Sequence, residues 1–141
     1  MKIELNLDIK AVPHQSVRVT KRGYTYQPKK IKDYKQTIQT MVREQLPSHF
    51  CIIEKGTPIA INKLYYIFEY PKSFSKVKQK NTIFKTTKPD LHDNLNKAFF
   101  DALEGVVWEQ DQNICLMKDV RKIYGEKSKI IISIEQIYEN S

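Results

Sequence analysis

Apolar residues in this sequence repeat with two different periods, and the order of those periods limits the folds that the chain can adopt. Apolar and polar residues alternate in 1–10, which is typical of a strand with one buried face. In 29–45 apolar residues recur at steps of three and four, which predicts an amphipathic helix. Pro28 and Pro47 flank this predicted helix.

The rest of the chain continues this mixture of strand and helix patterns. β-Branched and aromatic residues predict further strands, and a second helical pattern lies between them. The expected segments are a strand at 58–69, a helix at 91–104 and strands at 113–123 and 129–137, with a turn at Tyr124-Gly125-Glu126. The order β-α-β-α-β-β predicts an α+β fold, in which a mixed β-sheet and two main helices form a single small domain over 1–141.

Length and composition exclude several classes of protein. With 141 residues and 40% hydrophobic content, the chain can bury a core without disulfide bonds. No apolar run approaches the roughly 20 residues that cross a bilayer, and the charged N-terminal segment is unlike a secretory signal. We therefore expect a cytoplasmic protein with no membrane partner. Cys51 and Cys115 lack zinc-ligand spacing and are expected to be reduced, partly buried thiols.

The formal net charge of +8 favours a polyanionic partner, and the basic residues gather in two segments. The first, 18–35, begins in a long basic loop over 11–27, where we expect a short hairpin around Arg22-Gly23. The second, 72–88, contains lysines and no acid. The residues expected to contact DNA are Arg18, Lys21, Arg22, Lys29, Lys30, Lys76, Lys78, Lys80, Lys85 and Lys88. A merely solvated basic surface is the alternative interpretation.

Acidic residues gather in the segment 88–111. On a helical wheel, the apolar residues of the second predicted helix form one stripe, which must face the core. Asp93, Lys97 and Glu104 fall on the opposite side, with Lys97 one turn after Asp93. The core stripe consists of Leu91, Leu95, Ala98, Phe99, Ala102 and Leu103.

The acids also have a purely structural interpretation. Asp90 could cap the helix, with Asp93 three residues later completing a capping box. Asp93 and Lys97 could form an exposed ion pair worth less than about 1 kcal/mol. Asp111 could be an ordinary turn residue. Spacing alone does not separate these roles from a catalytic one.

The basic surroundings favour a catalytic role. Carboxylates beside a phosphate-binding surface repel the phosphates that the lysines attract, and a divalent cation removes that conflict. Mg²⁺ prefers oxygen ligands and keeps positions for water and for substrate phosphate oxygens. It polarises the phosphoryl group and lowers the pKa of a bound water, which creates a nucleophile. The acids, Lys97 and the basic surface together indicate a phosphodiesterase.

The segment 88–111 also resembles a known family. It reads KPD at 88–90, DNL at 93–95, then Lys97, DAL at 101–103 and Asp111, a pattern similar to that of the RusA family of Holliday-junction resolvases. The basic segment 13–35 resembles the loop and first helix of the same family. The resemblance covers most of the chain, and its specific part is the DNLxK region.

The resemblance implies an endonuclease that resolves four-way junction DNA by paired strand cleavage in recombination and repair. It implies a homodimer with a Mg²⁺ cofactor, for which Mn²⁺ is a substitute. It also implies that Asp90, Asp93 and Asp111 ligate the metal and that Lys97 assists catalysis. Phe100 lies off the core stripe and is a candidate dimer contact, with packing under a loop of its own chain as an equal alternative.

The sequence departs from the family pattern at one position. The family usually spaces its first two acids as Asp-x-Asp, whereas Leu91 and His92 separate Asp90 from Asp93 here. One extra residue turns a helical position by about 100°, so Asp90 reaches a shared metal only if it lies before the helix. His92 is either a substitute ligand or, as we expect, a surface residue of the first turn.

Two other functions stay open at this stage. In a non-catalytic nucleic-acid-binding module, the acids would serve only as caps and ion pairs. An RNA-directed nuclease would share the chemistry and differ in its substrate.

Overall fold

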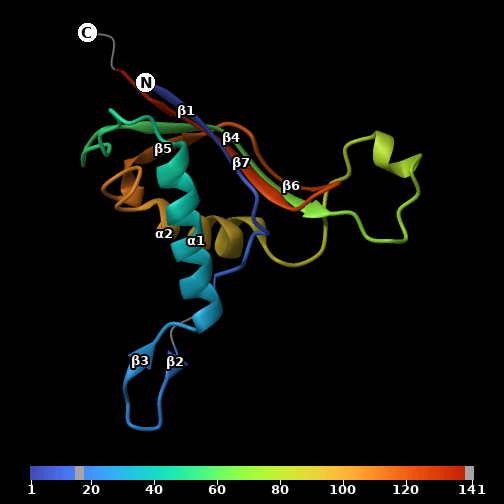
Figure 1. Ribbon diagram of the computed structural model, residues 1–141, viewed down its shortest axis with the longest axis horizontal. Coiled ribbons are helices and arrows are strands. Elements are labelled where there is room, and N and C mark those ends of the chain that lie inside the picture. Colours follow the sequence, from blue (N-terminus) through green and yellow to red (C-terminus); the bar gives the residue numbers. More distant parts are fainter. Residues whose placement is uncertain (15–17, 139–141) are drawn as a thin grey trace.

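The computed structural model describes residues 1–14 and 18–138, and a β-sheet forms its centre (Figure 1). The strands of the sheet are β1 (Lys2–Leu7), β4 (Ile59–Glu69), β5 (Ile114–Met117), β6 (Val120–Gly125) and β7 (Lys129–Gln136). A separate hairpin consists of β2 (Arg18–Val19) and β3 (Thr25–Tyr26). The α-helices are α1 (Lys29–Gln45) and α2 (Asn96–Leu103). Shorter turns are 3₁₀-helical at Lys78–Lys80 and Asp111–Asn113 and π-helical at Leu91–Leu95.

The sheet is mixed and is organised around β4. On one edge β7 pairs antiparallel with β4, and β1 pairs antiparallel with β7. On the other edge β5 and then β6 pair with β4 in parallel. Parallel strands need a crossover connection, and the segment between β4 and β5 provides it. This crossover contains α2 and the candidate acids.

Both helices cover one face of the sheet, where they pack against each other (Figure 1). Alternate residues of β1 and residues of α1 at three- and four-residue steps are buried, as their periods predict. These residues are Ile3, Leu5, Leu7, Ile31, Tyr34, Ile38 and Val42. The predicted stripe of the second helix is also buried, except that Leu91 is half-buried. The predicted α+β fold, with its mixed sheet and two main helices, is therefore confirmed.

The prediction of one continuous strand over 113–123 is wrong, because β5 and β6 are separated at Lys118 and Asp119. Beside the break, the pairing of β4 with β7 shifts register between Ile61 and Lys63, which marks a bulge in β4. The register of β4 with β5 and with β6 is the same on both sides, because Ile61 pairs with Met117 and Leu64 with Val120. Two backbone hydrogen bonds bridge the break. The N–H of Lys118 donates to the carbonyl of Ile61, and the N–H of Leu64 donates to the carbonyl of Asp119. The chain thus stays beside β4 while its strand is interrupted.

Two smaller expectations also need correction. The turn before β7 starts at Glu126, since Gly125 still pairs with Glu69 of β4. Cys51 and Cys115 are free, as expected, but both are exposed rather than partly buried. Cys115 lies on β5, whose residues after Ile114 are all exposed. Cys51 lies exposed in the loop after α1.

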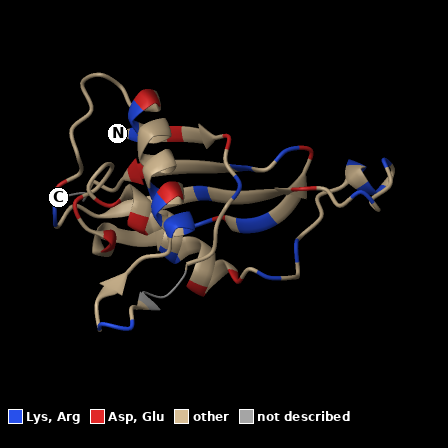
Figure 2. Ribbon diagram, turned by 60° about the horizontal axis from the view of Figure 1, so that its bottom comes forward, with Lys and Arg blue, Asp and Glu red and all other residues tan. Residues whose placement is uncertain are grey.

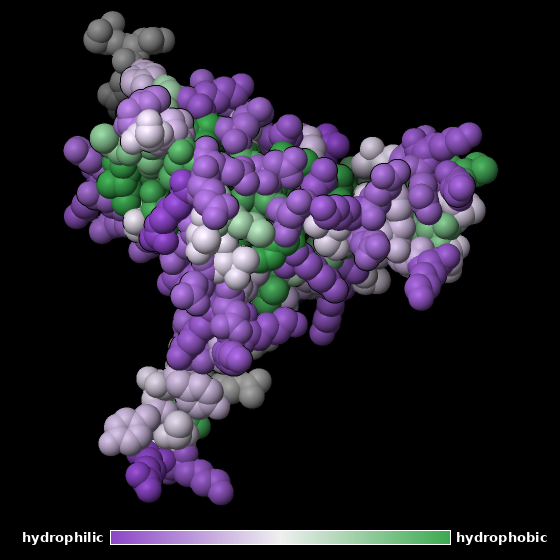
Figure 3. All heavy atoms as spheres, viewed as in Figure 1, coloured by the Kyte–Doolittle hydropathy of each residue, from purple (hydrophilic) through white to green (hydrophobic). Residues whose placement is uncertain are grey.

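Two basic segments project from the body of the protein (Figure 1). One is the β2–β3 hairpin, which confirms the expected turn and has Gly23 at φ 85°. The other is the arm, defined as residues 71–88. Lys and Arg residues colour the hairpin tip and parts of the arm in Figure 2, and hydrophilic side chains predominate at both projections in Figure 3, with a small hydrophobic group at the outer end of the arm. Among the described residues, no helix is long and apolar enough to span a bilayer.

Candidate active site

The acid-bearing segment begins with a π-helical turn that leads directly into α2. The N–H of Leu95 donates to the carbonyl of Asp90 at 3.0 Å, which is the five-residue step of a π turn. A π turn holds one more residue than an α turn. The extra residue between Asp90 and Asp93 is therefore accommodated within the helix, and Asp90 lies at its start, as the metal-ligand hypothesis requires.

The structural interpretation of Asp90 and Asp93 is not supported by their contacts. Asp90 is exposed and makes no side-chain capping bond, so there is no capping box. No Asp93–Lys97 ion pair forms among the described residues. Asp93 instead lies 3.2 Å from Nε2 of His92, and both side chains are more than 70% exposed. His92 is thus a surface residue of the first turn, as expected, and Lys97 is exposed one turn further on.

Asp111 has a different setting, because the buried side chain of Trp108 holds it in place. The fully buried indole of Trp108 donates from Nε1 to Oδ1 of Asp111 at 2.7 Å. Trp108 is in turn packed edge-on against Phe100, with ring centroids 5.9 Å apart. Gly105, at φ 85°, permits the tight turn after α2 in which its N–H bonds the Trp108 carbonyl. Asp111 is therefore a fixed, half-buried carboxylate rather than an ordinary turn residue.

Other carboxylates lie close to Asp111. The pKa of Asp111 is raised from 3.8 to about 6, chiefly by burial and also by the negative charges of Glu104 and Asp101, while the Trp108 donor partly opposes this shift. The backbone N–H of Asp111 also donates to Oε2 of Glu104 at 3.3 Å. Sequence reasoning placed Glu104 on the exposed side of the helix but missed its contact with Asp111. It named Asp101 only as part of the DAL motif and missed that this carboxylate lies near Asp111.

The carboxylates of the acid-bearing segment are ligands that suit a hard divalent cation. Carboxylates are its preferred ligands, and a cation would relieve the cost of holding Asp111 ionised near other acids. Among the described residues, however, no three acidic, histidine or cysteine side chains converge as a metal site. Asp111 is grouped with Asp101 and Glu104, whereas Asp90 and Asp93 stand exposed at the start of the helix.

The basic hairpin is attached beside the acids. The N–H of His14 donates to the carbonyl of Asn94 at 2.9 Å, which ties the chain before the hairpin to the turn that carries Asp93. Lys21 and Arg22 are exposed at the hairpin turn, and Lys29 and Lys30 are exposed in the first turn of α1. The side chain of Arg18 lies outside the described residues.

The arm offers lysines of two kinds. Lys76, Lys78, Lys80 and Lys88 are exposed, and the Lys78 ammonium lies 4.0 Å from the ring centroid of Phe74. Lys85 is half-buried, since its Nζ bonds the hydroxyl of Thr87 at 2.7 Å and faces the ring of Tyr124. The exposed lysines are free to meet phosphate, whereas Lys85 has partners within the protein.

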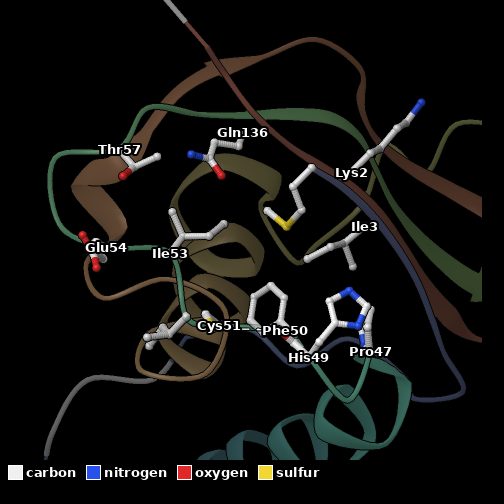
Figure 4. Close-up of a pocket in the computed structure, with 12 residues that line it drawn as sticks. Lys2, Ile3, Pro47, His49, Phe50, Cys51, Ile53, Glu54, Thr57 and Gln136 are labelled. Atoms are coloured by element: carbon white, nitrogen blue, oxygen red, sulfur yellow. Dashed lines mark hydrogen bonds between the residues drawn. The ribbon is translucent and has the colours of Figure 1, made fainter.

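A cavity of about 580 Å³ opens at the end of the sheet near Met1 and the loop after α1 (Figure 4). Its lining includes Ile3, Phe50 and Ile53, whose side chains face the same space in Figure 4. None of the candidate acids lines it. The chemistry indicated by the acids therefore belongs to an open surface that suits a large polyanion, and not to this pocket.

The raised pKa of Asp111 predicts a pH-dependent stability. An unfolded carboxyl ionises near pH 3.8 and the folded one near pH 6, so the wild type loses stability as pH rises through this interval. Asp111→Asn keeps an acceptor for Trp108 and removes the buried charge. It should raise the free energy of unfolding by roughly 1–2 kcal/mol at pH 8, after allowance for solvent at this half-buried group.

Thermal melts at pH 4 and pH 8 measure this effect, and the two proteins should converge at pH 4. Asp8→Asn is the control, because Asp8 is exposed and pairs with Lys127 at the surface. A variant that is less stable than the wild type at both pH values would show that Asp111 has only a structural role.

Comparison with protein families agrees with this geometry. The family model described as Endodeoxyribonuclease RusA matches residues 8–135, which include the hairpin, the arm, the acid-bearing segment and Asp111. A search of curated proteins gave no match. Because the family match spans nearly the whole chain, the enzymatic reading is preferred over a non-catalytic binding module. The protein belongs to the RusA family of endodeoxyribonucleases, which resolve Holliday junctions by hydrolysing phosphodiester bonds.

Proposed function

We propose that this protein is a Mg²⁺-dependent nuclease that resolves four-way DNA junctions by paired cleavage in recombination and repair. The observation that carries the proposal is the half-buried Asp111, held by Trp108 among further acids on a basic protein. A carboxylate kept ionised at such a place is costly. Binding of a divalent cation is the function that offsets this cost.

Asp90, Asp93 and Asp111 are the ligands that we propose. Asp90 has no capping bond to lose, and Asp93 contacts only the exposed His92. Both are therefore available to a cation without disruption of the fold. The bound cation would supply a polarised phosphoryl group and a more acidic water, and Mn²⁺, which also takes carboxylate oxygens, is expected to substitute.

Lys97 is the side chain whose positive charge we propose assists catalysis. It is exposed one turn after Asp93. A positioned ammonium near the scissile phosphate stabilises the negative charge that develops during hydrolysis. Among the described side chains it has neither an ion pair nor a hydrogen bond that would have to break first.

The hairpin, the start of α1 and the arm form the proposed DNA surface. The first turn of α1 contains no acid, although acids are favoured there by the helix dipole. Exposed lysines at this end instead create a site that suits phosphate. Tyr24 and Tyr26 on the hairpin are 70% and 44% exposed, so their rings are available to nucleotides.

A homodimer is also part of the proposal, because a four-way junction needs two cuts and a two-fold pair of sites supplies them. Phe100 is not a strong candidate for the interface, since it is half-buried and packs on Trp108 of its own chain. Sedimentation of the wild type at micromolar concentration should show a dimer. A protein that stays monomeric on a junction would contradict this part of the proposal.

The cleavage experiment compares a synthetic four-way junction in Mg²⁺ and in EDTA. The wild type should make symmetric cuts in Mg²⁺ alone. Asp111→Asn and Asp93→Asn should reduce cleavage to near background, because the cation loses an anionic ligand. Junction affinity in EDTA should stay the same or increase, since a repulsive charge is removed.

Asp8→Asn serves as the control and should cleave like the wild type. A folded and fully active Asp111→Asn would contradict the metal-site assignment. Junction binding with no cleavage by the wild type would favour the binding module instead. Competition among junction, duplex DNA and RNA tests the substrate, and stronger inhibition by RNA would favour an RNA-directed nuclease. A cytoplasmic location and a single endonuclease domain over 1–141 remain predictions.

The role of the arm is tested by the salt dependence of binding. On duplex arms, each neutralised phosphate contributes about 0.9 to the slope of log affinity against log salt. Replacing Lys76, Lys78 and Lys80 together with Gln should therefore flatten the slope. Lys55→Gln, at the other end of the sheet, should leave the slope unchanged. An unaltered slope and affinity in the triple variant would remove this part of the arm from the DNA surface.

A further inference from the structure

Two neighbouring residues of the sheet reach across to the segment that carries the candidate acids. Tyr66 of β4 and Lys122 of β6 are register partners in the parallel pair of strands. Residues paired in this way point to the same face of a sheet. Here that face is the one covered by α2, against which the ring of Tyr66 packs through Phe99.

Lys122 holds the chain immediately before Asp90. Its Nζ donates to the carbonyl of Thr87 at 2.6 Å and to the carbonyl of Pro89 at 2.7 Å. Lys122 is half-buried, so these carbonyls supply partners that partly replace water around the ammonium. Two of its three N–H donors are thus committed to the backbone beside Asp90.

Tyr66 holds the other end of the same segment. Its side chain is fully buried, and its hydroxyl donates to Oδ1 of Asn96 at 2.9 Å. Burial raises the pKa of Tyr66 well above its ordinary value, so the hydroxyl keeps its proton. Asn96 directly precedes Lys97 in the sequence.

We propose that Lys122 and Tyr66 are positioning residues that fix both ends of the segment 90–97 against the sheet and so set the placement of Asp90 relative to Lys97. The proposal rests on the proposed function, in which Asp90 ligates the metal and Lys97 assists catalysis. Neither Lys122 nor Tyr66 belongs to the sequence pattern that carries the family resemblance.

The local structure explains why such anchoring is needed. The segment starts with a π turn, which is a less regular arrangement than an α-helix. Asp90 has no side-chain bond that would hold it. Its position therefore depends on the backbone, and the Thr87 and Pro89 carbonyls are the backbone groups before Asp90 that the sheet holds through a side chain.

Backbone pairing strengthens the same connection. The N–H of Lys85 donates to the carbonyl of Lys122, and the N–H of Tyr124 donates to the carbonyl of Ile83. Residues 83–85 thus run beside β6 and bring the chain to Lys122 just before the acids. Loss of the Lys122 ammonium would leave this strand-like contact in place and would free only Thr87 and Pro89. The expected effect is a displaced ligand rather than an unfolded protein.

The experiment measures metal affinity without DNA. Mn²⁺ binding is followed by electron paramagnetic resonance for the wild type, Lys122→Met and Tyr66→Phe. Loss of a residue that orients a metal ligand typically lowers metal affinity by about 10- to 100-fold. Lys122→Met should therefore weaken Mn²⁺ binding by at least about 10-fold. Tyr66→Phe acts nearer to Lys97, so it should lower the single-turnover cleavage rate more than it weakens Mn²⁺ binding. Junction affinity in EDTA should change less than two-fold for both variants.

The opposite face of the sheet supplies matched controls. Lys63 and Tyr65 are half-buried residues of β4 that contact each other through a cation–π interaction. Lys63→Met and Tyr65→Phe remove the same groups, so a general loss of sheet stability would affect these variants too. They should retain wild-type Mn²⁺ affinity and cleavage rate.

A double-mutant cycle with Asp90→Asn identifies the residue through which Lys122 acts. If it acts through Asp90, Lys122→Met should weaken Mn²⁺ binding no further in the Asp90→Asn background. Additive losses in that cycle, or unchanged Mn²⁺ affinity in Lys122→Met, would overturn the positioning role of Lys122. Cleavage by Tyr66→Phe at the wild-type rate would overturn the positioning role of Tyr66. Wild-type affinity in Asp90→Asn alone would instead show that the ligand assignment in the proposed function has failed.

Discussion

Burial of one face of α2 and of the π turn before it is the constraint on which the arrangement of the site depends. Leu95, Phe99 and Leu103 are fully buried, and each such side chain contributes roughly 1.5–3 kcal/mol when it leaves water. An exposed ion pair contributes less than about 1 kcal/mol. The core therefore decides how the helix is rotated, and the polar edge with Asp93 and Lys97 follows from it. The parallel pairing of β4 with β6 then places side chains of the sheet beside the backbone at both ends of this polar edge.

The electrostatics of the protein combine two opposite demands. A net charge of +8 with exposed lysines on two projections attracts DNA, yet the body between the projections carries acids that repel phosphate. Trp108 places Asp111 where burial and nearby carboxylates make its negative charge costly. In the proposed function, a divalent cation would reconcile these demands, because it would neutralise the acids and offer positive charge to the phosphate that is cleaved.

Much of this arrangement is predictable from periodicity, but the contacts that fix it are not. The period of the apolar residues gave the bounds of α1 and the buried stripe of α2, since burial repeats with the helix itself. The break between β5 and β6 lies beside a bulge in a different strand, β4, which no local pattern encodes. The Trp108–Asp111 bond and the reach of Lys122 to Pro89 likewise depend on tertiary packing. The motif located the acids, and the fold supplied their surroundings.

The central claim, that Asp111 is a metal ligand, is tested most directly by counting protons during metal binding. Titration calorimetry of Mg²⁺ or Mn²⁺ in buffers of different ionisation enthalpy gives that number at each pH. A ligand with a pKa of about 6 must lose its proton to bind metal. The account predicts proton release at pH 5.5, little release at pH 8, and an affinity that rises with pH and then levels off. Metal binding without proton release at pH 5.5, or no metal binding at all, would contradict it.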